Sequence, residues 1–293
     1  MDEEPAFTVT HAHHNFHIVT VPTMGATTGD EVFRALLRSD AHHDSPHNLW
    51  KMEESHLKQA MEYGAPILDA GDCFDVMQTR RDPRREMGGK QAEHERLNYM
   101  DRVVEDAATD YAPYAPNWVM LGEGNHESAI LKHLGTDMPE RLATMLRERA
   151  DTNVRKGGYF GWVKFKFHIC GAHISKLVAY YHGTGGGAPV TQGVIHSQRN
   201  SRKYPDADVV WTGHLHTEWA MTWARFRANR YNRLYEDEQL HICTPGYKRI
   251  QNPSRGFEVE RCGNEPKPVG AAWLTFRWEA TTKTIIVDRE RAK

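Results

Sequence analysis

The stretch Val209-Val210-Trp211-Thr212-Gly213-His214-Leu215-His216 places two histidines directly after a short apolar run. An apolar run of this length that ends at a glycine is typical of a buried β-strand that stops in a turn. Imidazole nitrogens suit divalent metal ions such as Zn²⁺, Fe and Mn²⁺. The stretch therefore predicts a strand end that carries metal ligands.

Side chains able to bind metal follow four further apolar runs: Asp40 and His42 after Ala35-Leu36-Leu37, Asp72 after Ile67-Leu68, Asn125 after Trp118–Leu121, and His182 after Ala179-Tyr180-Tyr181. Open α/β sheets bind their ligands outside the carboxyl ends of the strands. Five such strand ends in chain order favour a hydrolase that holds two divalent metals at one edge of a sheet. Two ions close together lower the pKa of a bridging water and stabilise an in-line displacement at phosphorus.

Helical periodicity is confined to the first half of the chain. Apolar residues predict a helix over 49–61, stopped by Gly64, and a second helix over 97–111. Asp137 and Glu140 form a capping box that predicts the start of a third helix. These helices alternate with the apolar runs, as in an α/β fold.

From residue 158 onward the sequence predicts mostly strands. Alternating strands and helices followed by strands favour two β-sheets flanked by helices. The chain contains no repeat, low-complexity tract or composition change that marks a boundary, so we expect a single domain over 1–293.

Composition excludes several classes of protein. The formal charge is −2 and the pI about 6.8, so no global positive field attracts nucleic acid, although a local basic patch remains open. No run approaches the roughly 20 apolar residues of a membrane span. The four cysteines show no C-x-x-C spacing, which is typical of reduced thiols in a cytoplasm. The acidic N-terminus does not resemble a signal peptide. We therefore expect a cytoplasmic protein.

The ligand pattern resembles the five motifs of the calcineurin-like metallophosphoesterase superfamily. The motifs stand in family order and cover residues 40–216: Asp40-x-His42, Gly71-Asp72-x-x-Asp75, Gly124-Asn125-His126-Glu127, His182 and Gly213-His214-x-His216. The family fold is a four-layer α-β-β-α sandwich of two mixed sheets. The spacing and an Arg-rich loop are also similar to metallophosphoesterases of tailed phages, which would act in the host cytoplasm.

The resemblance implies a role for each of these positions. One metal would be held by Asp40, His42 and His216, and the other by Asn125, His182 and His214. Asp72 would bridge the two ions. His126 would bind no metal and would stabilise the transition state or protonate the leaving oxygen, oriented by Asp75. The ions are expected to be Mn²⁺, with Fe, Zn²⁺ or Ni²⁺ as alternatives.

Two outer carboxylates are also candidates. We expect Glu127 to hold its own loop and Asp44 to support the ligands, because histidines that bind metal usually need an outer partner.

Two segments are candidates for substrate recognition. The loop over 76–92 contains Arg81, Arg84 and Arg85, whose guanidinium groups suit phosphate oxygens. The alternative is a solvated charged loop. Residues 219–233 interleave tryptophans with arginines, a pattern that suits single-stranded nucleic acid. The alternative, which we favour, is a β-hairpin with packed tryptophans and a charged tip.

The sequence therefore predicts a binuclear metal-dependent phosphoester hydrolase in which a metal-bridging hydroxide attacks phosphorus. The two arginine-containing segments slightly favour a phosphodiesterase or nuclease, with nucleic acid as a possible partner. A phosphomonoesterase acting on phosphoprotein or small molecules is the second interpretation. A non-catalytic scaffold is the third, but every motif position is filled here. The oligomeric state stays open.

Overall fold

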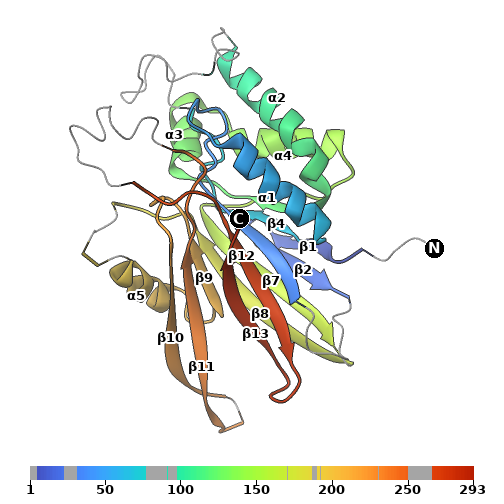
Figure 1. Cartoon of the computed structure of the whole chain (residues 1–293), viewed down its shortest axis with the longest axis vertical. Helices are drawn as coiled ribbons and strands as arrows, with labels where there is room; N and C mark the ends of the chain where they lie inside the picture. The colour runs from blue at the N-terminus through green and yellow to red at the C-terminus, as the bar shows by residue number, and fades with distance from the viewer. Residues whose placement is uncertain are drawn as a thin grey trace.

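The computed structural model describes residues 5–22, 32–76, 91, 98–169, 171–186, 190–191, 193–229, 231–249 and 266–293. Within this part of the chain two mixed β-sheets pack against each other and helices flank them (Figure 1). The expectation of an α/β fold with two mixed sheets flanked by helices is confirmed.

The seven-stranded sheet has the order β1 (Thr8–His13), β2 (Phe16–Val21), β7 (Phe160–Ile169), β8 (Ala172–Tyr181), β9 (Val209–Thr212), β11 (Leu234–Cys243) and β10 (Trp219–Ala228). Hairpin partners run antiparallel, whereas β2–β7, β8–β9 and β9–β11 are parallel. The parallel pairing of β8 and β9 brings their carboxyl ends, and the residues that follow them, side by side.

The six-stranded sheet has the order β13 (Thr284–Arg291), β12 (Ala272–Glu279), β3 (Val32–Arg38), β4 (Ile67–Asp69), β5 (Trp118–Leu121) and β6 (Arg155–Lys156). From β3 to β6 the strands are parallel, and β12 pairs antiparallel with both β3 and β13. Because β3, β4 and β5 are parallel neighbours, the three segments after them meet at one edge of this sheet.

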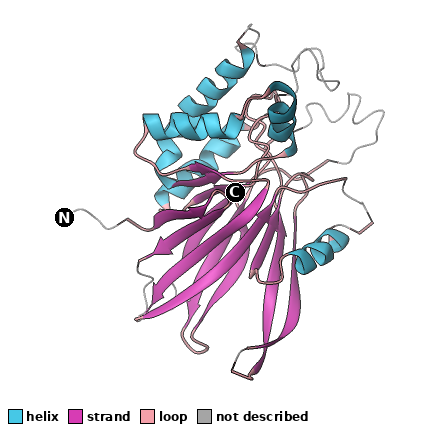
Figure 2. Ribbon diagram, turned by 180° about the vertical axis from the view of Figure 1, so that it is seen from behind, coloured by secondary structure: helices cyan, strands magenta, loops and turns pink. Residues whose placement is uncertain are grey.

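The helices lie on both outer faces (Figure 2). They are α1 (Trp50–Glu62), α2 (Tyr99–Tyr111), the 3-10 helix η2 (Ala112–Asn117), α3 (Asn125–Leu134), α4 (Met138–Arg149) and α5 (Val194–Lys203). An apolar core joins α1, α2 and α4 to the six-stranded sheet, and a second core fills the space between the sheets. A smaller cluster packs β8 and β9 beside α5. Among the described residues no helix is long and apolar enough to cross a membrane.

Local chemistry explains the predicted helices. Gly64 follows α1 at φ +57°, a left-handed conformation that glycine adopts without strain. The side chain of Asp137 accepts a hydrogen bond from the Glu140 N–H and so caps α4, as predicted. Two α-helices were missed. α3 begins within the Gly124-Asn125-His126 motif, and the polar α5 lacks a regular apolar stripe.

Candidate metal centre

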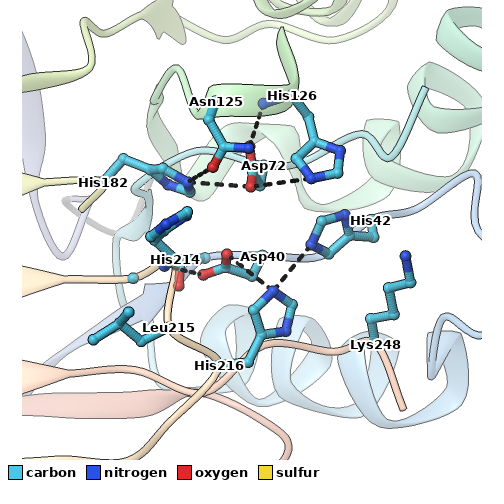
Figure 3. A network of polar contacts seen from close by, with 12 residues as sticks. Asp40, His42, Asp72, Asn125, His126, His182, His214, Leu215, His216 and Lys248 are labelled. Atoms are coloured by element: carbon cyan, nitrogen blue, oxygen red, sulfur yellow. Dashed lines mark hydrogen bonds and ion pairs between the residues drawn. The ribbon is translucent and has the colours of Figure 1, made fainter. Parts of the chain in front are cut away.

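The seven predicted ligands converge at the strand ends, where the two sheets meet (Figure 3). Their donor atoms form two groups, each within 4.8 Å: Asp40, His42 and His216 in one, and Asp72, His182 and His214 in the other. Asn125 contacts the second group. We call these the first and second triads. Clustered histidines and carboxylates of this kind are able to hold metal ions.

The first triad presents three donor atoms to one point. The Nε2 atoms of His42 and His216 lie 3.3 Å apart, and His216 Nε2 lies 3.4 Å from Asp40 Oδ1. Asp40 is fully buried, and its Oδ1 has no hydrogen-bond partner among the described residues. A buried carboxylate oxygen costs free energy unless a cation or donor satisfies it. The residues present therefore fit a bound cation.

The second triad shows the same excess of acceptors. His182 Nε2 lies 3.1 Å from Asp72 Oδ2. The terminal amide of Asn125 lies within 3.3 Å of His182 Nε2, Asp72 Oδ2 and His214 Nδ1. A cation between these atoms would satisfy them together with the Asn125 carbonyl oxygen. The second triad therefore also fits a metal ion.

The far nitrogen of three of these rings is held by an outer acceptor. His182 Nδ1 lies 2.9 Å from the Ala70 carbonyl oxygen, and His214 Nε2 lies 3.0 Å from that of Gly185. His42 Nδ1 lies 3.0 Å from Asp75 Oδ1. The two carbonyl oxygens hold the far nitrogens of His182 and His214 and leave the other nitrogen of each ring facing the second triad, the usual arrangement of histidines that bind metal.

Five of the candidate ligands have left-handed backbones, with φ of +54° at Asp40, +47° at His42, +54° at Asp72, +67° at His214 and +50° at His216. Such conformations cost non-glycine residues free energy and gather at functional sites. Hydrogen bonds between strand ends maintain them: His42 N–H donates to the Asp72 carbonyl and His214 N–H to Asp40 Oδ2. Nothing in the sequence signals this strain.

Two motif glycines allow close approach of backbone to carboxylate. A Cβ on Gly124 would overlap Asp72 Oδ1, and a Cβ on Gly213 would lie 2.6 Å from Asp40 Oδ2. Any side chain at either position would displace a carboxylate of the cluster. This is the physical reason for glycine before Asn125 and before His214.

Asp72 and His182 share charge in the buried cluster. Burial alone would raise the pKa of Asp72, but His182 and His126 hold it well below its usual range. Burial would lower the pKa of His182, and Asp72 instead raises it to about 10. A cation bound by these two side chains would displace the proton that they share.

His126 and Asp75 are close together, but not through the contact we expected. His126 Nδ1 lies 2.7 Å from the backbone carbonyl oxygen of Asp75, whereas the Asp75 carboxylate is 3.8 Å away. That carboxylate contacts His42 and Lys248, at 3.0 and 2.8 Å. Burial alone would raise the pKa of Asp75, but the neighbouring His42 and the charge of Lys248 lower it.

Lys248 was missed by the sequence analysis. It lies 173 residues from Asp75 and belongs to no ligand motif. Figure 3 shows it beside His42. No signal in the sequence links these positions.

Two outer carboxylates support the ligand loops. Glu127 is buried and accepts hydrogen bonds from the N–H groups of Asp72, Phe74 and Gly124. It therefore ties the end of β4 to the start of α3, as expected. Asp44 accepts from the N–H groups of Asp75 and Val76 and from the Tyr99 hydroxyl.

The predicted substrate-binding residues Arg81, Arg84 and Arg85 lie outside the described residues. Residues 219–229 and 231–233 belong to the hairpin of β10 and β11.

The tryptophans and two arginines of this hairpin contact the body of the protein. Trp223 Nε1 donates to Ser197 Oγ of α5. Arg225 pairs with Asp237, and Arg225 and Arg227 both donate to the Pro205 carbonyl. These contacts support the interpretation of a packed β-hairpin.

Comparison with known proteins gives distant structural likenesses. No family model and no curated protein matches the sequence. A conserved uncharacterized protein of Streptococcus pneumoniae TIGR4, described as a predicted phosphoesterase, is 9% identical over 89% of this chain and 98% of that chain, with a TM-score of 0.32. GAP50, the anchor in the inner membrane complex of Plasmodium, is 12% identical over 89% of each chain, with a TM-score of 0.39. Both are too distant to transfer an activity.

Proposed function

We propose that this chain is a binuclear metal-dependent phosphoester hydrolase. The observation that carries the proposal is the pair of donor triads at the strand ends, with Asp72 in the second and with outer acceptors beside the rings of the buried His42 and His182 and the half-buried His214. In this proposal Asp40, His42 and His216 hold one ion and Asn125, His182 and His214 hold the other. Asp72, which belongs to the second triad, would bridge to the first.

Two divalent ions held there would supply an activated water and neutralise charge on a phosphoryl group. The chain's own residues would position that chemistry. Glu127 fixes the backbone around Asp72, and Asp75 fixes the ring of His42. Mn²⁺ is the proposed metal, and Fe, Zn²⁺ and Ni²⁺ are alternatives that the same ligands accept.

His126 would act on the leaving group. Its Nδ1–H is held by the Asp75 carbonyl oxygen, so its Nε2, which lies 3.8 Å from Asp72 Oδ2, is the atom at which it would carry a proton to the departing oxygen. Burial lowers the pKa of His126, although Asp72 partly offsets this.

Within this class we propose a phosphodiester as the substrate, with a phosphomonoester as the alternative. The test is a parallel assay of Mn²⁺-supplemented protein on bis-p-nitrophenyl phosphate, p-nitrophenyl phosphate and single-stranded DNA. Faster cleavage of the diesters is the expected result. Cleavage of the monoester alone would replace the diester interpretation. A protein that binds two ions and hydrolyses none of the three would point to a non-catalytic scaffold.

A further inference from the structure

A small basic hollow lies directly beside the second triad. It has a volume of about 160 Å³, and we call it the α5 hollow. Its walls include Gly183 and Gly213, which adjoin His182 and His214 in the chain, and the side chains of His196, Arg199 and Lys203 of α5. The wall of the hollow is therefore one residue along the chain from two ligands of the second triad.

We propose that the α5 hollow binds a second phosphate group of the substrate, next to the phosphorus that is attacked. This inference rests on the proposed phosphoester hydrolase function and deepens it. The ligand chemistry is a phosphate linked to the scissile one, as in a single-stranded polynucleotide. The same chemistry occurs in a nucleoside diphosphate, which is the second source to test.

The α5 hollow is lined by basic side chains. His196, Arg199 and Lys203 follow one another at spacings of three and four residues, so they project from one face of α5. No acidic residue lines the hollow among the described residues. A larger hollow of about 390 Å³, near the start of β7, contains Glu123 and Glu140 and so suits an anion poorly.

Lys203 lies against aromatic rings. Its ammonium lies 4.0 Å from the centre of the Tyr181 ring and 5.2 Å from that of Tyr204. Aromatic faces hold the cation by a cation–π interaction without neutralising it. Within the part of the chain that the structure describes, Asp208 pairs with Lys176 and Asp237 with Arg225, and no carboxylate pairs with Lys203 or Arg199. Both charges therefore stay available to an anionic ligand.

Helix α5 packs against the β10–β11 hairpin. Trp219 packs against Gly193 at the start of the helix, so closely that any Cβ there would meet the indole ring. Ser197 lies within 3.6 Å of Met221 Sδ and accepts from Trp223. The tryptophans of the β10–β11 hairpin thus hold the basic face of α5 in place. A fixed group loses less entropy when it binds a ligand than a mobile one.

The test compares substrates with and without a second phosphate. The double variant Arg199→Gln/Lys203→Gln is assayed on bis-p-nitrophenyl phosphate, on a thymidine dinucleotide, and on the same dinucleotide with a terminal 5′-phosphate. We expect kcat/KM to fall about tenfold on the phosphorylated dinucleotide only, because charge-assisted contacts to that phosphate are lost. The matched control Lys58→Gln/Arg277→Gln removes the same charge from surface positions and should leave all three rates unchanged.

A second arm does not depend on turnover. Binding of a fluorescent oligothymidine is measured by anisotropy with the full-length protein, with thymidine diphosphate as competitor. Weaker oligonucleotide binding in the double variant than in the control supports the hollow. If thymidine diphosphate competes at a concentration similar to that at which the oligothymidine binds, the hollow takes the phosphate of a small nucleotide. Equal binding by both variants overturns the proposal. If the native protein does not hydrolyse bis-p-nitrophenyl phosphate at all, that result contradicts the proposed function and not the phosphate-binding hollow.

Discussion

The backbone carbonyl of Asp75, and not its carboxylate, accepts the hydrogen bond from His126 Nδ1 at 2.7 Å. The carboxylate is therefore free to hold His42 Nδ1 on one side and the Lys248 ammonium on the other. One residue thus positions two different histidines by two different groups. A mutation of the Asp75 side chain should therefore affect His42 and leave the contact between the Asp75 carbonyl and His126 in place.

Asp75→Asn should weaken the metal site of the first triad. The substitution removes the charge that holds His42 Nδ1–H but retains the backbone carbonyl that holds His126. Loss of such an outer partner costs about 10- to 100-fold in metal affinity. Calorimetric titration with Mn²⁺ measures it.

The control is Asp110→Asn, which removes a carboxylate 2.9 Å from Nε2 of His43, a histidine outside both triads. Equal metal affinities in the two variants would contradict a positioning role for Asp75.

Asp72→Asn should reduce the occupancy of both proposed metal positions. The neutral amide lacks the charge that holds His182 and that would bridge toward the first triad. Metal content per chain, measured by mass spectrometry after dialysis, is expected to fall from two toward zero. A variant that still holds two ions would disprove the bridge.

His126→Ala should retain its metals and lose turnover. Removing a general acid typically lowers kcat by about 100- to 10,000-fold. His133→Ala is the matched control, because His133 lies exposed on the same helix α3. Unchanged diester hydrolysis in His126→Ala, with metal content intact, would show that the residue has no role in the chemical step.

The buried His17 should make the folded protein sensitive to acid. Burial and the neighbouring His11 lower the pKa of His17 to about 3, whereas an unfolded histidine titrates near 6.5. Below 6.5 the unfolded chain therefore binds a proton that the folded chain rejects, and stability falls as pH falls. This linkage predicts a loss of about 2 kcal/mol between pH 7 and pH 5.

Urea unfolding at the two pH values tests the prediction. His17→Gln should lose less stability between them than the native protein, by about that amount. His133→Gln, at an exposed position, is the control. An identical pH dependence in the native protein and in His17→Gln would rule out the contribution of His17.

Much of the fold was predictable because its signals are local. The helices at 50–62 and 138–149 have apolar stripes and termination or capping residues within a few positions. The start of α3 was missed because its first residues are the metal motif itself, and α5 because even its buried residues, Ser197 and Asn200, are polar. In α3 the residues of the candidate metal centre replace the pattern that reveals a helix.

The sequence by itself determined which residues can bind metal, because donor chemistry is a property of each side chain and the apolar runs mark the strand ends. The resemblance of the motifs implied how the ligands divide into two groups, whereas the tertiary structure decided their distances and placed Asp72 with His182 and His214, since sheet order sets the distances between strand ends. It also decided that the Asp75 carboxylate faces His42 and Lys248 instead of His126. The basic hollow beside His182 and His214 likewise depends on where α5 packs, because through-space contacts between distant segments leave no periodic trace in the chain.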